Sequence, residues 1–228
     1  MTRRLFNHLF PLSWLAPACF AAGDARQLFQ EVTRRYQGLK SYYFEGKTVA
    51  QSIFNGKTTE TETGFTVALE APAKFRLEFR YPTAGNWLRV SDGTSFLESR
   101  SITKESKVTP VKGREINALR ASPLHNFERL SQTAVNPMIM RVEFIEVDGK
   151  KLECDFVQFE AGRRQLRKDE WPGPSMVWVS RSDRLVMREE IRTSAKTGEN
   201  LTETRRTTFI EHFSVDQPLA AELFHVKA

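Results

Sequence analysis

The residue types that most often perform catalysis or bind metals are few in this chain, and their spacing matches no known site. His8 lies in the apolar N-terminal stretch, and His125, His212 and His225 belong to no metal-binding or acid–base motif. The motifs G-x-S-x-G, H-E-x-x-H, the P-loop and C-x-x-C do not occur. A histidine without a partner motif is usually a surface or helix-end residue. We therefore predict no enzyme activity, no catalytic or metal-binding residue and no cofactor.

The other polar candidates have structural explanations. Asp92 and Asp148 each precede a glycine in a predicted hairpin turn, where the side chain helps the backbone to turn. Cys154 lies between Leu152 and Phe156, which is typical of a small buried hydrophobe rather than a nucleophile. Because it is the only cysteine after residue 22, it cannot form an internal disulfide.

Strands with one apolar face are the clearest structural signal. Over residues 73–81 apolar and charged side chains alternate strictly, with Phe75, Leu77 and Phe79 on one side. A period of two indicates a sheet with one solvated face and one apolar face. The same alternation occurs over residues 65–69. A continuous apolar face of this kind must be covered by other elements or filled by a ligand.

Turn sequences divide the rest of the chain into further strands. Asn55-Gly56 and Asp148-Gly149 predict hairpins, as does Ser91-Asp92-Gly93, for which we expect a type I′ turn. Ile145 and Val147 leave the alternation that begins at Met138, which predicts a β-bulge at that point. In all, about ten to eleven strands are expected.

Two helical regions are expected beside the strands. Asp24 is suited to cap a helix whose apolar residues recur at helical spacing until Gly38. Residues 112–132 change period and suit one or two short helices broken at Pro123. An amphipathic helix needs an apolar surface, and the apolar face of the sheet is the natural one.

The apolar residues that face one way along the predicted strands form the candidate ligand-binding surface. The same residues could instead fill a closed core, and the residue pattern leaves both alternatives open. They are Phe65, Val67, Leu69, Phe75, Leu77, Phe79, Leu88, Val90, Phe96, Met138, Met140, Val142 and Phe144.

The N-terminus is typical of a secretory signal peptide. Arg3 and Arg4 precede an uncharged stretch that ends in small residues, so residues 1–22 are predicted to be removed and residues 24–228 to form one domain. The two arginines also resemble a twin-arginine export motif. A membrane anchor is the competing interpretation, but Pro11 and Pro17 interrupt the run. Cys19 offers a further alternative, a lipid anchor, although the residues before it fit that motif poorly.

Charge and composition exclude one class of partner. The net charge is +6, and it falls to +4 without the two signal-peptide arginines. Acidic residues are interleaved with basic ones throughout, so no nucleic-acid partner is expected. The densest charge run, residues 163–170, has no aromatic residue for base stacking and is predicted to be a solvated loop.

Several short motifs resemble the LolA-like carriers of outer-membrane lipoproteins. They are the signal peptide, the opening amphipathic helix, the turn Val90-Ser91-Asp92-Gly93, the segment Trp178-Val179-Ser180 and the ending Pro218 to Phe224. The resemblance implies an α+β fold: an incomplete, strongly curved antiparallel β-barrel whose apolar cavity is covered by short helices. It also implies a periplasmic monomer that binds a lipid or an acylated lipoprotein and contacts inner- or outer-membrane proteins transiently.

One residue departs from the family pattern. The best-known carriers have an arginine before the proline that opens the strand at 73–81. In those carriers this arginine makes a polar contact between the barrel and its lid. Here Ala71 precedes Pro72 and cannot make that contact. The alternative on the same fold is a regulatory or protein-interaction module that senses lipid or lipoprotein without carrying it.

Overall fold

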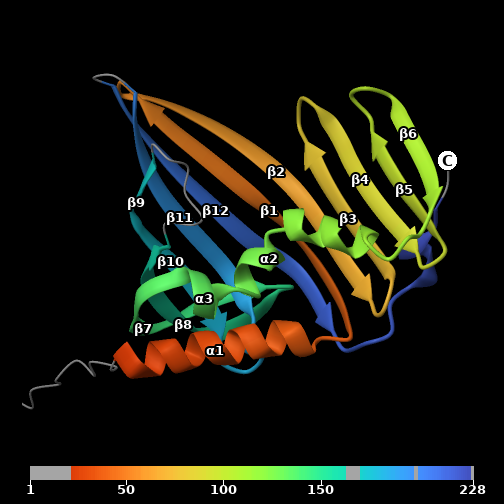
Figure 1. Ribbon diagram of the computed structural model, residues 1–228. Helices are drawn as coiled ribbons and strands as arrows, with labels where there is room; N and C mark the ends of the chain where they lie inside the picture. The colour runs from red at the N-terminus through yellow and green to blue at the C-terminus, as the bar shows by residue number, and fades with distance from the viewer. Residues whose placement is uncertain (1–21, 163–169, 198–199, 227–228) are drawn as a thin grey trace, which may run out of the picture.

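A single strongly curled sheet with helices on its inner face forms the body of the protein (Figure 1). The computed structural model describes residues 22–162, 170–197 and 200–226. The predicted signal peptide up to residue 21, including Cys19, lies outside the described residues, as does most of the charge run at 163–170. The described sheet has 12 strands that pair antiparallel and stays open at both edges, so the predicted incomplete, curved α+β barrel is confirmed.

The order of the strands explains why helices cross the sheet. Across the sheet the order is β6-β5-β4-β3-β2-β1-β12-β11-β10-β8-β7, and β9 pairs with β11 beside β10. β6 and β7 follow one another in sequence but lie at opposite edges, so the connection between them must span the inner face. The strands are β1 (Ser41–Phe54), β2 (Lys57–Glu70), β3 (Lys74–Tyr81), β4 (Gly85–Asp92), β5 (Ser95–Arg100), β6 (Glu105–Pro110), β7 (Ala134–Val147), β8 (Lys150–Ala161), β9 (Glu170–Pro172), β10 (Pro174–Ser180), β11 (Val186–Thr197) and β12 (Asn200–Val215).

This connection, residues 111–133, is the lid. It contains the 3-10 helix η1 (Glu115–Ala121) and the helices α2 (Leu124–Phe127) and α3 (Leu130–Thr133). The predicted break at Pro123 is confirmed, because this residue separates η1 from α2. Leu124, Phe127 and Leu130 are buried beneath the lid, so its apolar side faces the sheet.

The first helix, α1 (Ala22–Gly38), lies along the same inner face. Its buried residues include Phe29, Val32 and Tyr36, which recur at helical spacing and pack on the sheet. The predicted capping role of Asp24 is wrong, because the helix begins at Ala22 and Asp24 lies in its first turn. An acidic residue there still interacts favourably with the helix dipole.

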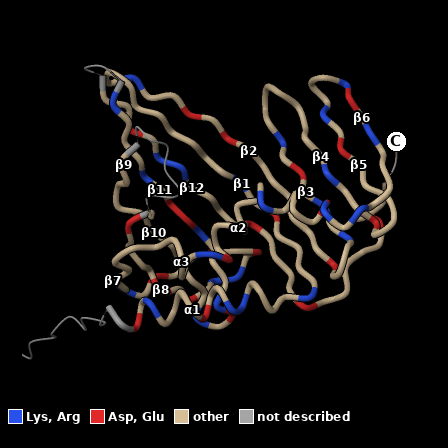
Figure 2. Tube along the Cα trace, viewed as in Figure 1, with Lys and Arg blue, Asp and Glu red and all other residues tan. Residues whose placement is uncertain are grey.

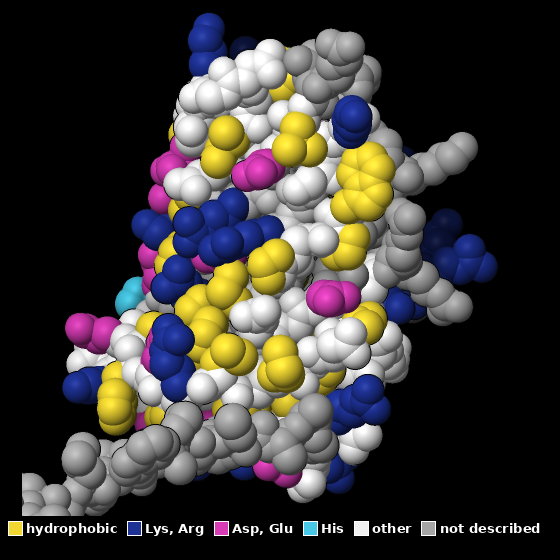
Figure 3. All heavy atoms as spheres, turned by 90° about the vertical axis from the view of Figure 1, so that its left-hand side faces the viewer, with side chains coloured by type: hydrophobic (Ala, Val, Ile, Leu, Met, Phe, Trp, Pro, Cys, Tyr) yellow, Lys and Arg dark blue, Asp and Glu magenta, His cyan; other side chains and the backbone are white. Residues whose placement is uncertain are grey.

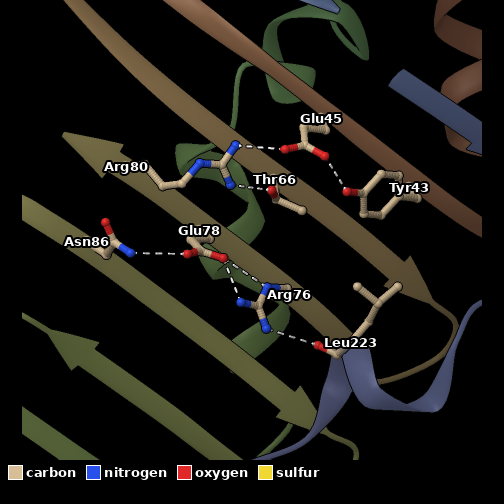
Figure 4. Close-up of polar contacts among 8 residues, drawn as sticks. All are labelled: Tyr43, Glu45, Thr66, Arg76, Glu78, Arg80, Asn86 and Leu223. Carbon is tan, nitrogen blue, oxygen red and sulfur yellow. Dashed lines mark hydrogen bonds and ion pairs between the residues drawn. The ribbon is translucent and has the colours of Figure 1, made fainter. Parts of the chain in front are cut away.

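The register confirms the alternation predicted for β3. Leu77 pairs with Val67 and Phe79 with Phe65, so these side chains share the inner face, the face covered by α1 and the lid. Arg76, Glu78 and Arg80 point to the opposite, outer face (Figure 4).

On the outer face, polar side chains bind neighbouring strands to one another. Arg76 bonds Glu78 through Nη2 at 2.6 Å, and its Nη1 donates to the carbonyl of Leu223 at 3.4 Å. That contact holds the C-terminal 3-10 helix η3 (Ala221–Phe224) against β3. Arg80 donates to Thr66 at 2.7 Å and to Glu45 at 3.0 Å. More widely, acidic and basic residues are interspersed along the chain (Figure 2).

Two local predictions are corrected by the backbone. The hairpin at Asp92-Gly93 forms, but only Gly93 has positive φ, at 95°, whereas a type I′ turn requires it at both central residues. Asp92 instead accepts hydrogen bonds from the backbone of Thr94 and Ser95, each at 2.7 Å. This side-chain bonding replaces the predicted turn type.

The predicted bulge near Ile145 is also misplaced. The register of β7 against β8 runs without a shift from Arg141 to Val147. It shifts earlier, between Val135 and Met138 and again before Arg141. Pro137 supplies a reason for the first shift, since it has no N–H to give to the ladder.

The turn of the β7–β8 hairpin contacts β12, and Val147, just before this turn, is buried. The backbone N–H of Asp148 donates to the carbonyl of Glu211 at 3.2 Å, and the Asp148 carboxylate contacts His212.

Candidate functional site

A cleft of about 350 Å³ lies between the lid and the inner face of the sheet. It is open to solvent on one side, and its volume is at the lower end of the range for small-molecule sites. Its lining comes from β1, β2, β3, β12 and the lid: Thr48, Thr63, Phe79, Tyr81, Arg120, Ala121, Ser122, Pro123, Asn126, Arg206 and Thr208.

Beside the cleft the inner face is packed against helices. Tyr36 of α1 stacks on Phe44 of β1 with ring centroids 6.1 Å apart and meets Phe127 of the lid at 5.9 Å. Phe65 and Leu77 are fully buried in the same cluster. Burying each such side chain contributes about 1.5–3 kcal/mol, so this surface becomes available to a ligand only if the lid moves away.

The structure brings together only part of the predicted binding surface. Phe65, Val67 and Leu77 lie in the common core, and Leu69 and Phe79 pack against it. Of the predicted residues, Phe79 is the one that lines the cleft beneath the lid.

Residues predicted from β4 and β5 lie elsewhere. Leu88 pairs with Glu78 and Val90 with Arg76, which places both on the outer face, away from Leu77. Phe75 and Phe96 share the inner face but contact each other, with centroids 6.0 Å apart, beyond the edge of the common core.

The residues predicted from β7 are also apart from the cleft. Met138, Met140 and Phe144 are 45%, 46% and 60% exposed, and Val142 is half-buried. β7 is an edge strand of the sheet, and it lies on the far side of β12 and β11 from β3. These four residues therefore form no common surface with those of β3, although Val147 of the same strand lies in the common core.

The lid helices are short and lack side-chain caps. None of η1, α2 and α3 has a side-chain hydrogen bond at its N-cap, and α2 and α3 have four residues each. Helices of this length have little stability of their own and depend on tertiary contacts. One such contact joins the lid to α1, where Thr33 donates to Ser131 Oγ at 3.0 Å.

A buried carboxylate lies close to the cleft. Glu189 of β11 pairs in register with Thr208, a lining residue, and is 2% exposed on the inner face. Burial raises its pKa to about 7, and the positive charge of Arg206 opposes that rise. Burial likewise raises the pKa of Tyr36, whose hydroxyl accepts the backbone N–H of Val186 at 3.2 Å. The inner face is thus poorly hydrated next to the cleft.

The β3–β6 part of the sheet, which we call the wing, carries two further hollows. One of about 780 Å³ is lined by residues of both charges, among them Glu98, Glu105 and Lys107. One of about 240 Å³ is lined by Trp87 and Arg100 among others. Arg100 lines both, so the hollows adjoin.

Metal binding needs a cluster of ligand side chains, and thiol chemistry needs a thiolate. They contain no group of three or more His, Cys, Asp or Glu side chains that could hold a metal ion. Burial raises the pKa of Cys154 to about 12, which keeps the thiol protonated. In the part of the chain that is described, no helix is both long and apolar enough to span a membrane.

Arg120, Arg206 and Thr208 were not foreseen from the sequence as site residues. They meet because β12 returns beside β1 and because the lid crosses the sheet. The period of two in β12 indicates that Arg206 and Thr208 lie on the same face of the strand. It does not indicate which strand pairs with β12, so the cleft could not be predicted from it.

Comparisons with known proteins give distant structural likenesses. The sequence matches no family model and no curated protein. MucB has a TM-score of 0.46 and 12% identity, with 90% of this chain and 64% of that chain covered, so this chain spans less than two thirds of MucB. A putative outer membrane lipoprotein-sorting protein domain from Vibrio parahaemolyticus has a TM-score of 0.35 and 10% identity, with 90% and 97% covered. A DUF1329 family protein from Desulfovibrio piger has a TM-score of 0.36 and 9% identity, with 90% and 97% covered. Likenesses at this level carry no argument about function, and the proposals below are argued from the geometry of this chain.

Proposed function

We propose that this protein is a periplasmic binding protein that holds the acyl chain of a lipid or lipoprotein between its half-barrel and its lid. In this role it carries the ligand toward the outer membrane or sorts it there. The observation that carries the proposal is the uncapped lid, which covers a buried apolar face and leaves a cleft beside it. The N-terminal signal-like stretch supports export, and the motifs that resemble LolA-like carriers agree with an acyl ligand.

An acyl chain suits this arrangement energetically. Each methylene that it buries contributes about 0.8 kcal/mol, so a long chain can replace the apolar contacts that the lid gives up. Phe79 marks the entrance, because it lines the cleft and also packs against the core that contains Phe65. A chain that enters at Phe79 would reach Phe65 and Leu77 as the lid residue Phe127 moves outward.

The first experiment asks whether the exported protein carries an acyl ligand. The protein is purified in native buffer, extracted with organic solvent and analysed by mass spectrometry. We expect an acylated species at close to one per protein. A protein without such a species that also fails to take up a fluorescent fatty acid would contradict the proposal.

A matched pair of variants locates the site. Phe79→Glu places a carboxylate at the entrance of the cleft, and we expect it to weaken fatty-acid uptake by about tenfold or more, since it removes the apolar ring and repels the carboxylate of the fatty acid. Phe96→Glu makes the same change on the inner face of the wing, where the side chain lines the 780 Å³ hollow instead. Equal losses in both variants, with equal melting temperatures, would argue against the cleft.

A protein-interaction module is the second candidate, and the outer face favours it. Figure 3 shows hydrophobic side chains around a group of basic ones on the side that carries β9 and β10. Met138, Met140 and Trp171 are each nearly half exposed, and Arg192 and Arg205 are similarly exposed. Exposed Met, Trp and Arg are characteristic of interfaces.

In-cell photo-crosslinking tests this candidate. A photoreactive residue at Met140 should capture one protein partner, whereas the same residue at Lys107, on the opposite edge strand β6, should capture none. A specific crosslink together with an empty lipid extract would favour the interaction module over the carrier.

A further inference from the structure

Two arginines and no carboxylate line the cleft beneath the lid, as far as its lining is described. The arginines are Arg120 of η1 and Arg206 of β12. The large hollow of the wing includes acidic residues, and so does an outer-face cleft of about 370 Å³ that contains Glu62 and Glu211. The small hollow of the wing also has an arginine and no carboxylate in its described lining, but that residue, Arg100, pairs with Glu98 at 3.3 Å. Of the hollows named above, the cleft beneath the lid is the one lined by two arginines without a carboxylate.

Uncharged hydrogen-bonding groups surround the two arginines. Thr48 and Thr208 face each other across β1 and β12 with hydroxyl oxygens 3.2 Å apart, and Ser122 and Asn126 contribute from the lid. Among the described residues, neither Arg120 nor Arg206 has an ion-pair partner within 4.0 Å. Guanidinium and hydroxyl groups together suit the oxygens of a carboxylate or a phosphate.

We infer that the ligand bound beneath the lid has an anionic polar end, a carboxylate or a phosphate, which lies between Arg120 and Arg206. This inference rests on the proposed acyl-binding function and adds the chemistry of the head group. The acyl chain lies against Phe79, and the anion remains at the open mouth, where both arginines are exposed to solvent. Since Arg120 belongs to the lid and Arg206 to the sheet, the anion also joins the two.

Arg206 has a competing structural role. Its charge acts on Glu189, which lies two residues along β11 from Ile191, the register partner of Arg206. A variant at position 206 could therefore act through this carboxylate instead of the ligand. The Glu189→Gln background separates the two roles, because it removes the carboxylate and keeps the side-chain shape.

The test is displacement of the neutral apolar dye N-phenylnaphthylamine from the exported protein by three ligands with the same dodecyl chain. Dodecanoate and dodecyl phosphate should displace the dye at concentrations about tenfold lower than dodecanol, since a charge-assisted hydrogen bond supplies roughly that factor. The better of the two anions indicates the source, a free fatty acid or a phospholipid.

Variants assign the effect to the two arginines. Arg120→Gln and Arg206→Gln should each weaken displacement by the anions about threefold, so that together they account for the tenfold preference, and leave dodecanol unchanged; the Arg206 effect should persist in the Glu189→Gln background. Arg129→Gln, an exposed lid residue outside the cleft lining, is the control and should behave as the wild type.

The possible failures are distinguishable. If dodecanol displaces the dye as well as the anions do, or if the Arg206 effect vanishes in the Glu189→Gln background, the anionic head group is overturned while acyl binding stands. If none of the three ligands displaces the dye, or if the dye does not bind, the proposed function fails as well.

Discussion

Glu189 and Glu190 are adjacent in β11 and almost equally buried, at 2% and 1% exposed, yet they point to opposite faces of the sheet. Glu189 lies deep on the inner face, where burial raises its pKa to about 7. On the outer face, burial of Glu190 would also raise its pKa, but hydrogen bonds from Arg205 and Arg192 outweigh that effect and hold the pKa below its ordinary value.

The contacts explain the difference. The Glu190 carboxylate forms ion pairs with Nη2 of Arg192 and of Arg205 at 2.6 Å each, and Nη2 of Arg188 lies 3.7 Å away. These arginines cover Glu190 while remaining partly hydrated themselves. Glu189 is covered by the body of the protein and has the charge of Arg206 as its one stabilising influence.

The comparison indicates what each face is built to do. On the outer face, ion pairs connect the strands. The Arg188 guanidinium also lies 4.3 Å from the ring centroid of Trp178 and 5.1 Å from that of Phe209, so cation–π contacts add to these connections. The inner face is joined by apolar packing and leaves even a carboxylate poorly solvated. The apolar inner face is suited to binding an acyl chain, whereas the ion pairs of the outer face are suited to keeping the sheet rigid.

The largest effect is expected from breaking the outer network. Glu190→Ala removes the charge-assisted hydrogen bonds from Arg192 and Arg205, and at about 1.5–3 kcal/mol per bond we expect a loss of about 3–5 kcal/mol in the free energy of unfolding. Urea denaturation measures this loss. Glu203→Ala is the matched control. Glu203 lies on β12, is exposed, and pairs in register with Ser194 of β11, the strand that contains Glu190. A loss no larger than that of the control would mean that Glu190 is not buried as described.

The opposite sign is expected on the inner face. Because the folded-state pKa of Glu189 is raised above 4.5, the native state binds more protons than the unfolded state between about pH 4.5 and pH 7, and stability falls as pH rises through that window. Glu189→Gln removes this fall and should stabilise the protein by on the order of 3 kcal/mol at about pH 8, with little effect at about pH 4.

Urea denaturation across this pH range checks the prediction. The informative quantity is the difference between variant and wild type, since other groups titrate in both proteins. A variant that is destabilised equally at every pH would show that Glu189 makes a favourable contact as a carboxylate, contrary to the comparison of the two faces.

How far the sequence predicts the fold can be argued from β3 and β4. The pleat imposes a period of two on every strand, so the inward direction of Phe75, Leu77 and Phe79 could be predicted from local sequence. Which residues of β4 join them depends on the register after the turn at 82–84, and a change of one residue reverses the face. Leu88 and Val90 were assigned to the wrong side for this reason.

The candidate site is less predictable than the fold. Phe79 could be found from alternation, but Arg206 lines the same cleft as Arg120 only because the lid crosses the face of the sheet to which β12 contributes. The sequence also contains no signal that separates Glu189 from Glu190, since the two differ only in the face on which they lie. Their different chemistry arises from neighbours contributed by β12.

The smallest effect concerns an exposed pair that sharpens the same comparison. Asp148, at the turn of the β7–β8 hairpin, contacts His212 of β12. The hydrogen bond from His212 lowers the pKa of Asp148, and the same bond raises the pKa of His212. The stability that this pair contributes is therefore lost as pH falls through the folded-state pKa of Asp148, and also as pH rises through that of His212.

His212→Gln should lower the melting temperature slightly at about pH 5.5 and leave it unchanged at about pH 9. Because solvent and salt screen an exposed pair, the difference should shrink further in high salt, whereas the Glu190→Ala effect should persist. A His212→Gln effect that is equally large at both pH values would mean that the hairpin is held to β12 by packing rather than by charge.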